Sequence, residues 1–426
     1  MSASVSLEAY RLATWLATPL TGLLLSWRLN HGKEDAMRLD ERRGWPSRPR
    51  PAGPLVWLHG ASVGEAASLL PLVEKLVESG HPALVTTGTV TSAALLERRL
   101  PGGAFHQYAP LDTPDFQRRF FAHWRPDIGL IAESEIWPNM IVEASKAGVP
   151  LVMVNGRMSA RSAARWRHAK AFIGALLSRF EQCLAQSRAD AERLRGLGAK
   201  RVTDLGNHKF DAPAPPADRK VLAALSGLVS GRRLWIAAST HAGEESVAAQ
   251  AHLRVAELFP DLLTLIAPRH PRRGPDIEAE LKALGLHTAL RSRGEQPGPG
   301  VHVYICDTIG ELGLFYRLAG IVFLGKSIVG QGGQNPIEPA KLACAVLHGP
   351  NVGNFRDIYD GLDRIGGAQT TGDSEELAQA LIALFGDPGK MRAMTRAAAD
   401  WVERQSGAAE RTLAAIAPRL APPAAA

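Results

Sequence analysis

The feature that most constrains the fold of this chain is a rhythm of short apolar runs separated by amphipathic stretches. Runs of four apolar or nearly apolar residues are typical of parallel strands buried on both faces, and helical patterns lie between them. In the first half the runs are 55–58, 83–86, 128–131 and 151–154, with helices expected near 65–79 and 160–180. The alternation predicts βαβ units and therefore a doubly wound parallel sheet.

A proline-rich segment at 211–218 divides the chain and is typical of a stiff linker. After it the rhythm restarts, with runs at 234–238, 262–266, 301–305 and 321–324. We therefore expect an α/β protein with two Rossmann-like domains, facing a central cleft where strand carboxyl ends bind ligands. The expected division is 1–50, 51–212, 219–416 and a flexible tail at 417–426.

The N-terminal segment contains a candidate membrane element. Residues 12–27 carry no charge, and a helix of this length spans about 24 Å, less than the roughly 30 Å of a hydrocarbon core. Basic residues outnumber acidic ones from Arg28 to Arg50, which places the rest of the chain in the cytoplasm by the positive-inside rule. We expect a single-pass or monotopic membrane anchor, with a buried soluble helix as the alternative.

Charge and cysteine content exclude several classes of function. The net charge of +7 is small for 426 residues, and no basic stripe is interleaved with aromatic residues. A nucleic-acid partner is therefore not expected, whereas anionic lipids and anionic sugars are compatible with the sign. The three cysteines form no CxxC pair, which excludes a zinc ribbon or a disulfide framework. The sequence contains no Asp-x-Asp motif that could coordinate a nucleotide-bound metal ion, so no metal or cofactor is expected.

Residues 320–327 match the P-loop pattern GxxxxGKS letter for letter. A functional P-loop needs its variable positions in an open loop that wraps phosphate, with a helix directly after it. Here the variable positions are a continuous apolar run, and Ile328 begins a glycine-rich stretch. We therefore predict a strand rather than a nucleoside-triphosphate site.

Acidic residues follow two of the expected strands in the first domain. Glu65 falls in the first turn of a helix, where an ionised carboxylate is favoured and can act as a general base toward a sugar hydroxyl. Complementing the helix N-terminus is an equally good reading of Glu65. His59 is an alternative base or, as we favour, a hydrogen-bonded core residue. Glu133 and Glu135 should point the same way, into a cleft or toward a cation, or serve as a cap and a salt bridge.

Two turns of the second domain suit an anionic ligand. Arg269, Arg272 and Arg273 follow a strand, and arginine binds phosphate or carboxylate in bidentate fashion. A glycine-rich loop at 330–335 runs into a helix expected near Pro336, where backbone N–H groups can cradle phosphate and Glu338 can accept from ribose hydroxyls. A solvated basic turn and a purely structural turn are the alternatives.

Taken in order, these motifs resemble the Kdo (3-deoxy-D-manno-octulosonic acid) transferases of lipopolysaccharide synthesis. The stretches that carry the resemblance are 32–42, 59–65, 133–139, 155–159, 206–211, 239–245, 268–271, 310–312 and 335–338. The resemblance implies the two-domain GT-B glycosyltransferase fold. It also implies an inverting, metal-free transfer of Kdo from CMP-Kdo to the tetraacyldisaccharide lipid A precursor, at an anionic inner-membrane surface. It leaves open how many Kdo units are added.

The same resemblance assigns roles to individual residues. Glu65 is implied to be the general base, while Glu133 and Lys209 are implied to stabilise the transition state. The implied CMP-Kdo contacts are Pro268, Arg269, Ile309, Gly310, Glu311, Asn335, Pro336, Ile337 and Glu338. His208 and Ala242 depart from the family pattern without replacing an implied catalytic residue. A GT-B enzyme that uses a UDP-sugar is the competing reading.

Overall fold

The computed structural model describes residues 3–420 and 422, with side chains from residue 5 onward. The chain forms two compact units. The first contains Met1–Ala212 and Gln405–Ala426, and the second contains Pro213–Arg404. The division at Ala212 falls inside the proline-rich segment.

The first unit is built on a seven-stranded parallel sheet with strand order β3-β2-β1-β4-β5-β6-β7. Its strands are β1 (Val56–His59), β2 (Ala83–Thr87), β3 (Ala104–Tyr108), β4 (Ile128–Ala132), β5 (Leu151–Gly156), β6 (Phe180–Ala185) and β7 (Val202–Asp204). Its helices are α1 (Ala3–Leu16), α2 (Thr21–Asn30), α3 (Val63–Glu78), α4 (Val90–Arg99), α5 (Pro114–Trp124), α6 (Pro138–Lys146), α7 (Ala160–Arg167), α8 (Lys170–Leu177), α9 (Arg188–Gly196) and α18 (Ala408–Ile416). Short 3₁₀ segments are η1 (Thr18–Leu20), η2 (Ala36–Arg43), η3 (His208–Phe210) and η6 (Ala417–Arg419).

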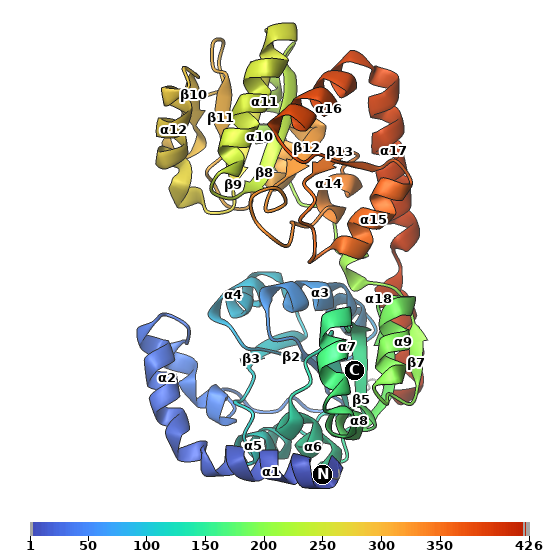
Figure 1. The fold of residues 1–426 in the computed structure, drawn as a ribbon. Helices are drawn as coiled ribbons and strands as arrows, with labels where there is room; N and C mark the ends of the chain where they lie inside the picture. Colours follow the sequence, from blue (N-terminus) through green and yellow to red (C-terminus); the bar gives the residue numbers. More distant parts are fainter. Residues whose placement is uncertain (1–2, 421, 423–426) are drawn as a thin grey trace. The chain divides into compact units, whose positions relative to one another are not determined.

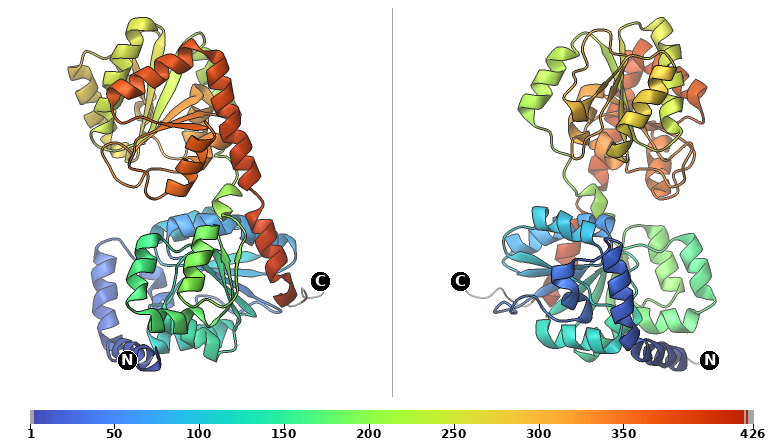
Figure 2. Two further views of the ribbon diagram at one scale, coloured as in Figure 1. Left: turned by 45° about the vertical axis from the view of Figure 1, so that its right-hand side comes forward. Right: turned by 90° about the vertical axis from the view of Figure 1, so that its left-hand side faces the viewer.

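Alternate residues of the central strands enter two different cores, because successive side chains of a strand point to opposite faces. Trp57 and Ile131 pack with α5, α6, α8 and α9, whereas Leu58 and Leu130 pack with α3 and α18. The ribbon shows helices on both sides of this sheet (Figures 1 and 2). Both faces of the sheet are therefore covered, as a parallel sheet requires. The register pairs His59 with both Thr86 and Ile131, which aligns the carboxyl ends of β2, β1 and β4 along one edge, called the carboxyl edge below.

The second unit repeats this plan, with strand order β10-β11-β9-β8-β12-β13-β14 and every pair parallel. Its strands are β8 (Arg233–Thr240), β9 (Leu262–Pro268), β10 (Thr288–Leu290), β11 (Val303–Ile305), β12 (Ile321–Leu324), β13 (Ala345–His348) and β14 (Ala368–Thr370). Its helices are α10 (Arg219–Leu228), α11 (Glu244–Leu258), α12 (Gly274–Ala283), α13 (Leu312–Ala319), α14 (Ile337–Lys341), α15 (Arg356–Arg364), α16 (Ser374–Gly386) and α17 (Pro388–Gln405). The prediction of two parallel α/β sheets is confirmed.

The apolar runs located the central strands, but they missed the edges. The strands that the sequence pattern did not predict are β3, β6, β7, β10, β13 and β14, which are the edge strands and some of their neighbours. Edge strands need fewer apolar residues because part of their surface faces solvent. The helical stretch expected near 160–180 forms two helices, α7 and α8, and it ends before β6 begins at Phe180.

The C-terminal segment corrects the expected domain division. The sequence assigned residues up to 416 to the second domain, but α18 packs on α3 of the first unit, with Ala409 and Ile416 in its core. Asp211 accepts hydrogen bonds from the backbone N–H groups of Gly407 and Ala409 and so caps α18. An alanine-rich amphipathic helix does not encode which sheet it covers. Leu420, in the predicted flexible tail, packs against the same core, and residues 421 and 423–426 lie outside the described part.

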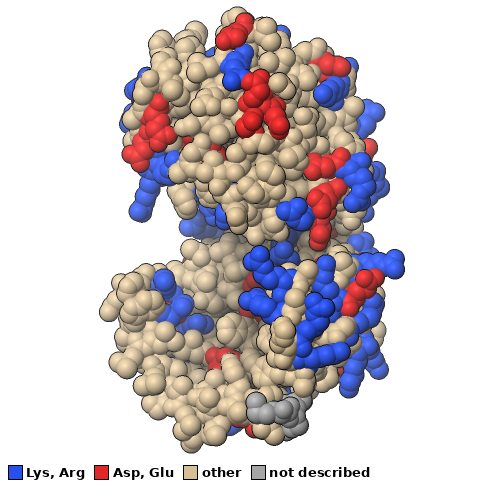
Figure 3. Space-filling model, viewed as in Figure 1, with Lys and Arg blue, Asp and Glu red and all other residues tan. Residues whose placement is uncertain are grey.

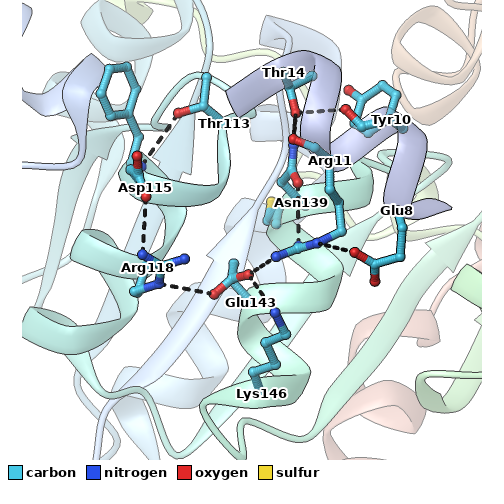
Figure 4. A network of polar contacts seen from close by, with 12 residues as sticks. Glu8, Tyr10, Arg11, Thr14, Thr113, Asp115, Arg118, Asn139, Glu143 and Lys146 are labelled. Atoms are coloured by element: carbon cyan, nitrogen blue, oxygen red, sulfur yellow. Dashed lines mark hydrogen bonds and ion pairs between the residues drawn. The ribbon is translucent and has the colours of Figure 1, made fainter. Parts of the chain in front are cut away.

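The apolar stretch near the N-terminus is not one helix. Pro19, which has no N–H group, lies in η1 between α1 and α2. Among the described residues, no helix has both the length and the apolar character needed to cross a membrane. α1 is fixed to the sheet unit through buried Arg11, whose guanidinium donates to Glu143 on α6 at 2.5 Å (Figure 4). Tyr10 of the same helix donates to Asp112.

Candidate active site

Backbone strain marks the carboxyl edges of both sheets. Four non-glycine residues with positive φ lie at strand ends: Glu133 (48°) after β4, Asn155 (50°) in β5, Ser239 (55°) in β8 and Lys326 (58°) after β12. A left-handed conformation costs about 1–3 kcal/mol for such residues and tends to be kept at functional sites. Each unit therefore has a candidate site at its own carboxyl edge.

Glu65 lies at the third position of α3 and forms a capping box with Ser62. The Ser62 N–H donates to the Glu65 carboxylate at 2.9 Å, and the Glu65 N–H donates to Ser62 Oγ at 3.4 Å. Gly60 makes this turn possible, because a Cβ there would lie 2.9 Å from the Glu65 Cβ. The half-buried carboxylate of Glu65 is therefore held at the carboxyl edge, and the capping interpretation of the sequence describes its ground-state contact.

Glu133 and Lys209 are brought together across 76 residues of sequence. Lys209 Nζ lies 2.8 Å from Glu133 Oε1. Asn155, to which the sequence analysis gave no role, accepts a hydrogen bond from the His208 N–H and so fixes η3 against β5. The Asn-Gly pair that follows an apolar run was an available signal, because asparagine tolerates positive φ.

Glu135 and His59 form a second polar pair beside Glu65. Glu135 Oε2 lies 3.9 Å from His59 Nε2 and accepts a hydrogen bond from Trp137 Nε1 at 2.6 Å. Burial, reinforced by the charge of Glu65, raises the pKa of Glu135 to about 7. Burial lowers the pKa of His59 to about 4, with a further contribution from Arg42. His59 is a buried, hydrogen-bonded residue, which is the reading that the sequence favoured.

In the second unit, the arginines of the basic turn after β9 differ in whether a carboxylate binds them. Arg273 is bound by buried Glu245, with contacts of 2.6 and 3.2 Å. Arg269 and Arg272 are exposed, and no ion pair to either is found in the described part of the chain. Pro268 ends β9 and is buried. The free guanidinium of Arg269 therefore remains available to an anion.

The 309–311 turn follows the end of β11 and begins α13. Ile309 is 87% exposed, and Gly310 adopts a φ of 88° that favours glycine. Arg291 donates two hydrogen bonds to the Glu311 carboxylate, at 2.7 and 3.1 Å, and lowers its pKa. Arg291 thus fixes the orientation of the Glu311 carboxylate, while Ile309 and Gly310 face solvent.

The four residues Asn335–Glu338 fold into a self-bonded turn. Asn335 Oδ1 accepts from the Ile337 N–H at 3.1 Å, and Asn335 Nδ2 donates to Glu338 Oε1 at 3.2 Å. Burial raises the pKa of Glu338. Pro336 precedes α14 as its N-cap, so the helix expected near Pro336 begins at Ile337 and has only five residues.

The segment that matches the P-loop pattern is a strand followed by a turn whose backbone N–H groups already bind a protein carboxylate. Its apolar positions form β12, as predicted. The backbone N–H groups of Lys326, Ser327 and Ile328 all donate to the carboxylate of fully buried Glu244. A protein carboxylate therefore takes the place that a phosphate would need, a role of Glu244 that the sequence pattern did not predict. An acidic residue opening the helix after a neighbouring strand was the available signal.

Comparison with known proteins identifies relatives of nearly the whole chain. Residues 37–212 match a family described as 3-deoxy-D-manno-octulosonic-acid transferase. A 3-deoxy-D-manno-octulosonic acid transferase of Bordetella pertussis is 36% identical over 380 residues, covering 86% of this chain and 88% of the relative. A probable mitochondrial enzyme of the same name from Arabidopsis thaliana is 34% identical, covering 93% of this chain and 92% of the relative.

Among solved structures, a putative UDP-N-acetylglucosamine 2-epimerase from Listeria monocytogenes superposes with a TM-score of 0.62. The match covers 87% of this chain and 99% of the epimerase at 16% identity, so it concerns the fold alone. The GT-B-like arrangement of two parallel sheets agrees with the expected fold class. With curated relatives above 30% identity that it covers almost completely, the chain belongs to the 3-deoxy-D-manno-octulosonic acid (Kdo) transferase family of glycosyltransferases.

Proposed function

We propose that this Kdo transferase moves Kdo from CMP-Kdo to a hydroxyl of the lipid A precursor, with inversion at the anomeric carbon. The observation that carries the proposal is the carboxyl edge of the first unit. There a helix-capping carboxylate, Glu65, accompanies a Glu133–Lys209 ion pair in a chain of this family. This edge supplies a base and a pair of opposite charges, which is what a single displacement at a sugar carbon requires.

In this mechanism Glu65 takes the proton of the acceptor hydroxyl as the hydroxyl oxygen attacks the anomeric carbon of Kdo. The bond from that carbon to the phosphate oxygen breaks, and CMP leaves with the bonding electron pair. Lys209 opposes the negative charge that develops on the leaving phosphate, and Glu133 holds Lys209 while opposing positive charge at the sugar. One displacement inverts the configuration.

The donor contacts belong to the second unit in this proposal. Arg269 offers a guanidinium without a carboxylate partner among the described residues, which suits the phosphate or the carboxylate of CMP-Kdo. The protonated form of Glu338, favoured by burial that raises its pKa, can donate as well as accept a hydrogen bond to ribose. Exposed Ile309 and Gly310 offer an apolar contact and a free backbone.

Attachment to an anionic inner-membrane surface is part of the same proposal, because the acceptor is a lipid. The N-terminal apolar surface consists of exposed Leu12, Trp15, Leu16, Leu20, Leu23, Leu24 and Trp27. An amphipathic segment of this kind can lie in the headgroup region without spanning the bilayer. Lys and Arg side chains also gather over α7 and α9 (Figure 3), including exposed Arg161, Arg165 and Arg167. We infer monotopic attachment with the catalytic units on the cytoplasmic side.

The proposal is tested by incubating the purified chain with CMP-Kdo and the tetraacyldisaccharide lipid acceptor in excess EDTA. Mass spectrometry should show Kdo added to the lipid, and NMR of the product should show the anomeric configuration opposite to that of the donor. CMP should compete with the donor and UDP should not. Competition by UDP alone would instead favour a UDP-sugar enzyme, the activity class of the fold neighbours.

A further inference from the structure

Strand β5 has an irregular carboxyl end. Met153 pairs with Cys183 of β6. The next pair joins Gly156 to Ala185, so β5 takes three steps where β6 takes two. The additional residue forms a β-bulge, a feature that changes the direction of side chains and often lies next to active sites. Asn155 lies in this bulge with a φ of 50°, so its side chain departs from the regular alternation of the strand.

The last residues of β5 bind the backbones on both sides of the Glu133–Lys209 ion pair. Val154 O accepts the N–H of Glu133 at 3.0 Å. Asn155 Oδ1 accepts the N–H of His208, the residue before Lys209, at 3.1 Å. Two consecutive residues of one strand therefore hold the two backbones whose side chains form the ion pair.

Helix α18 holds the same 3₁₀ segment, η3, through other atoms. The Thr412 hydroxyl contacts His208 Nε2 at 2.8 Å, and both residues are buried. Ser406 Oγ donates to Phe210 O at 3.0 Å. Asp211, which follows η3, accepts from two N–H groups at the start of α18. His208 is therefore held at its backbone by β5 and at its ring by α18.

Asn155 does more than tolerate a positive φ. Glycine would adopt this φ without strain. Asparagine instead buries an amide whose Nδ2 atom has no hydrogen-bond partner among the described residues, and an unpaired buried donor is unfavourable. What asparagine supplies and glycine lacks is the acceptor Oδ1. Since Asn155 is only 1% exposed, it acts on the reaction through other residues.

We propose that Asn155 and Thr412 are positioning residues, which hold η3 so that its lysine meets the carboxylate of Glu133. Lys209 Nζ lies 2.8 Å from Glu133 Oε1, and a displaced ammonium group stabilises the leaving phosphate less well. Misplacing a catalytic group by about 1 Å lowers a rate by about 10²-fold. This inference rests on the proposed function, in which Lys209 opposes the charge on that phosphate.

The experiment compares the effect of Asn155→Gly in two backgrounds. In the wild type, this substitution should lower kcat by about 10²-fold and leave CMP affinity unchanged, because the proposed donor contacts lie in the second unit. In the background Lys209→Met, which has no ammonium group to position, the same substitution should cause no further loss. The control is Arg125→Gly, which also replaces a residue of positive φ (39°) by glycine. Arg125 is exposed and follows α5, before β4 begins.

A second measurement needs no substrate. NMR of the full chain, labelled with ¹³C at lysine Cε, follows the Lys209 signal, which is assigned by its absence in Lys209→Met. In the wild type this signal should differ from that of an exposed lysine such as Lys200, because the ion pair restrains it. It should approach the exposed position in Asn155→Gly and stay in place in Arg125→Gly.

The two measurements separate this inference from the proposed function. If the chain transfers no Kdo but the Lys209 signal moves as expected, the function is wrong and the positioning stands. A Lys209 signal that stays in place in Asn155→Gly overturns the inference, as do losses of kcat that add in the double variant.

A second pair of variants keeps the test decisive if Asn155→Gly does not fold. Thr412→Val removes the hydroxyl that contacts His208 while keeping the shape of the side chain, and Thr412→Ser retains the hydroxyl. The Lys209 signal should move in Thr412→Val and stay in place in Thr412→Ser. A signal that does not move in Thr412→Val, or that moves equally in both variants, overturns the inference.

Discussion

At the residue scale, Glu65 occupies a position where one carboxylate serves two purposes. It accepts the Ser62 N–H in the capping box, and it is the side chain from which we expect proton abstraction. The two purposes are compatible because a carboxylate has two oxygens and about four acceptor sites. A substitution that preserves the cap but not the basicity can therefore separate them.

Glu65→Gln should abolish transfer and leave CMP binding intact. Glutamine still accepts from the Ser62 N–H, so the cost to folding should stay below about 1 kcal/mol. Losing a general base lowers the rate by about 10²–10⁴-fold, or about 3–5 kcal/mol of transition-state stabilisation. Single-turnover transfer and calorimetric CMP titration measure the two effects. Glu78→Gln, an exposed acid at the other end of α3, is the matched control. Near-normal transfer by Glu65→Gln would reduce Glu65 to a cap.

Glu244 should matter more than Lys326 in the P-loop look-alike. Glu244→Ala leaves the backbone N–H groups of Lys326, Ser327 and Ile328 without their acceptor, together with that of His241. The Ser327 group is buried, and an unsatisfied buried donor costs about 1–3 kcal/mol. Lys326→Ala removes only a side chain and should leave both stability and CMP affinity close to the wild type. Thermal melting with and without ATP tests this, with exposed Glu257→Ala on α11 as the control. Thermal protection by ATP that disappears in Lys326→Ala would show that a phosphate site exists after all.

At the scale of elements, α1 and α2 combine a docked side with an exposed apolar side. Arg11, Tyr10 and Thr14 bind side chains of the sheet unit, while Leu16, Leu20 and Leu23 are more than half exposed. Deleting this segment would remove buried Arg11 from buried Glu143 and leave that carboxylate with only the exposed side chains of Arg118 and Lys146, which should destabilise the unit. Membrane attachment should therefore be tested by substitutions on the exposed side.

Replacing Leu16, Leu20 and Leu23 together with Gln should weaken binding to vesicles that contain anionic lipid. Burying one leucine side chain in an apolar phase contributes about 1.5–3 kcal/mol, so three should lower the partition coefficient by at least about tenfold. Cosedimentation measures this. The control replaces three exposed leucines of the second unit, Leu253, Leu258 and Leu284. Equal losses in both triple variants, or no loss in either, would contradict an N-terminal attachment surface.

At the scale of the whole molecule, the chain returns to its first unit after completing the second. α18 is capped by Asp211, and its Thr412 hydroxyl contacts the Nε2 atom of His208 at 2.8 Å. The neighbouring Lys209 is the partner of Glu133. The last helix therefore supports the 3₁₀ segment that carries a candidate catalytic lysine.

Truncation after Arg404 should destabilise the first unit and reduce transfer, while the second unit keeps its stability. Removing α18 uncovers the sheet face that Ala409 and Ile416 close. The single substitution Ile416→Ala should cost about 2–5 kcal/mol by the same loss of burial. Differential scanning calorimetry should show one of two transitions move to lower temperature. Truncation after Leu420 is the control. Unchanged melting after removal of residues 405–426 would contradict the packing described for α18.

Sequence patterns predicted the parts of this protein that are encoded locally. Central strands buried on both faces must be apolar along their length, so 55–58 and 128–131 were recognisable as strands without any knowledge of the fold. The cap that holds Glu65 is also local, since Ser62 and Glu65 lie within one helical turn. Matching motifs in order gave the family, which the relatives confirm.

What only the tertiary structure decided are the contacts between residues far apart in the chain. The Glu133–Lys209 ion pair, the filling of the P-loop look-alike by Glu244 and the return of α18 to the first sheet all join distant segments. The pKa of Glu135 is raised by burial and by the charge of Glu65, neither of which its own sequence neighbours specify. The physical reason is common to all: hydrogen bonds, burial and charge act through space over a few ångströms. Local propensity decides which elements form, and packing decides which of their side chains meet.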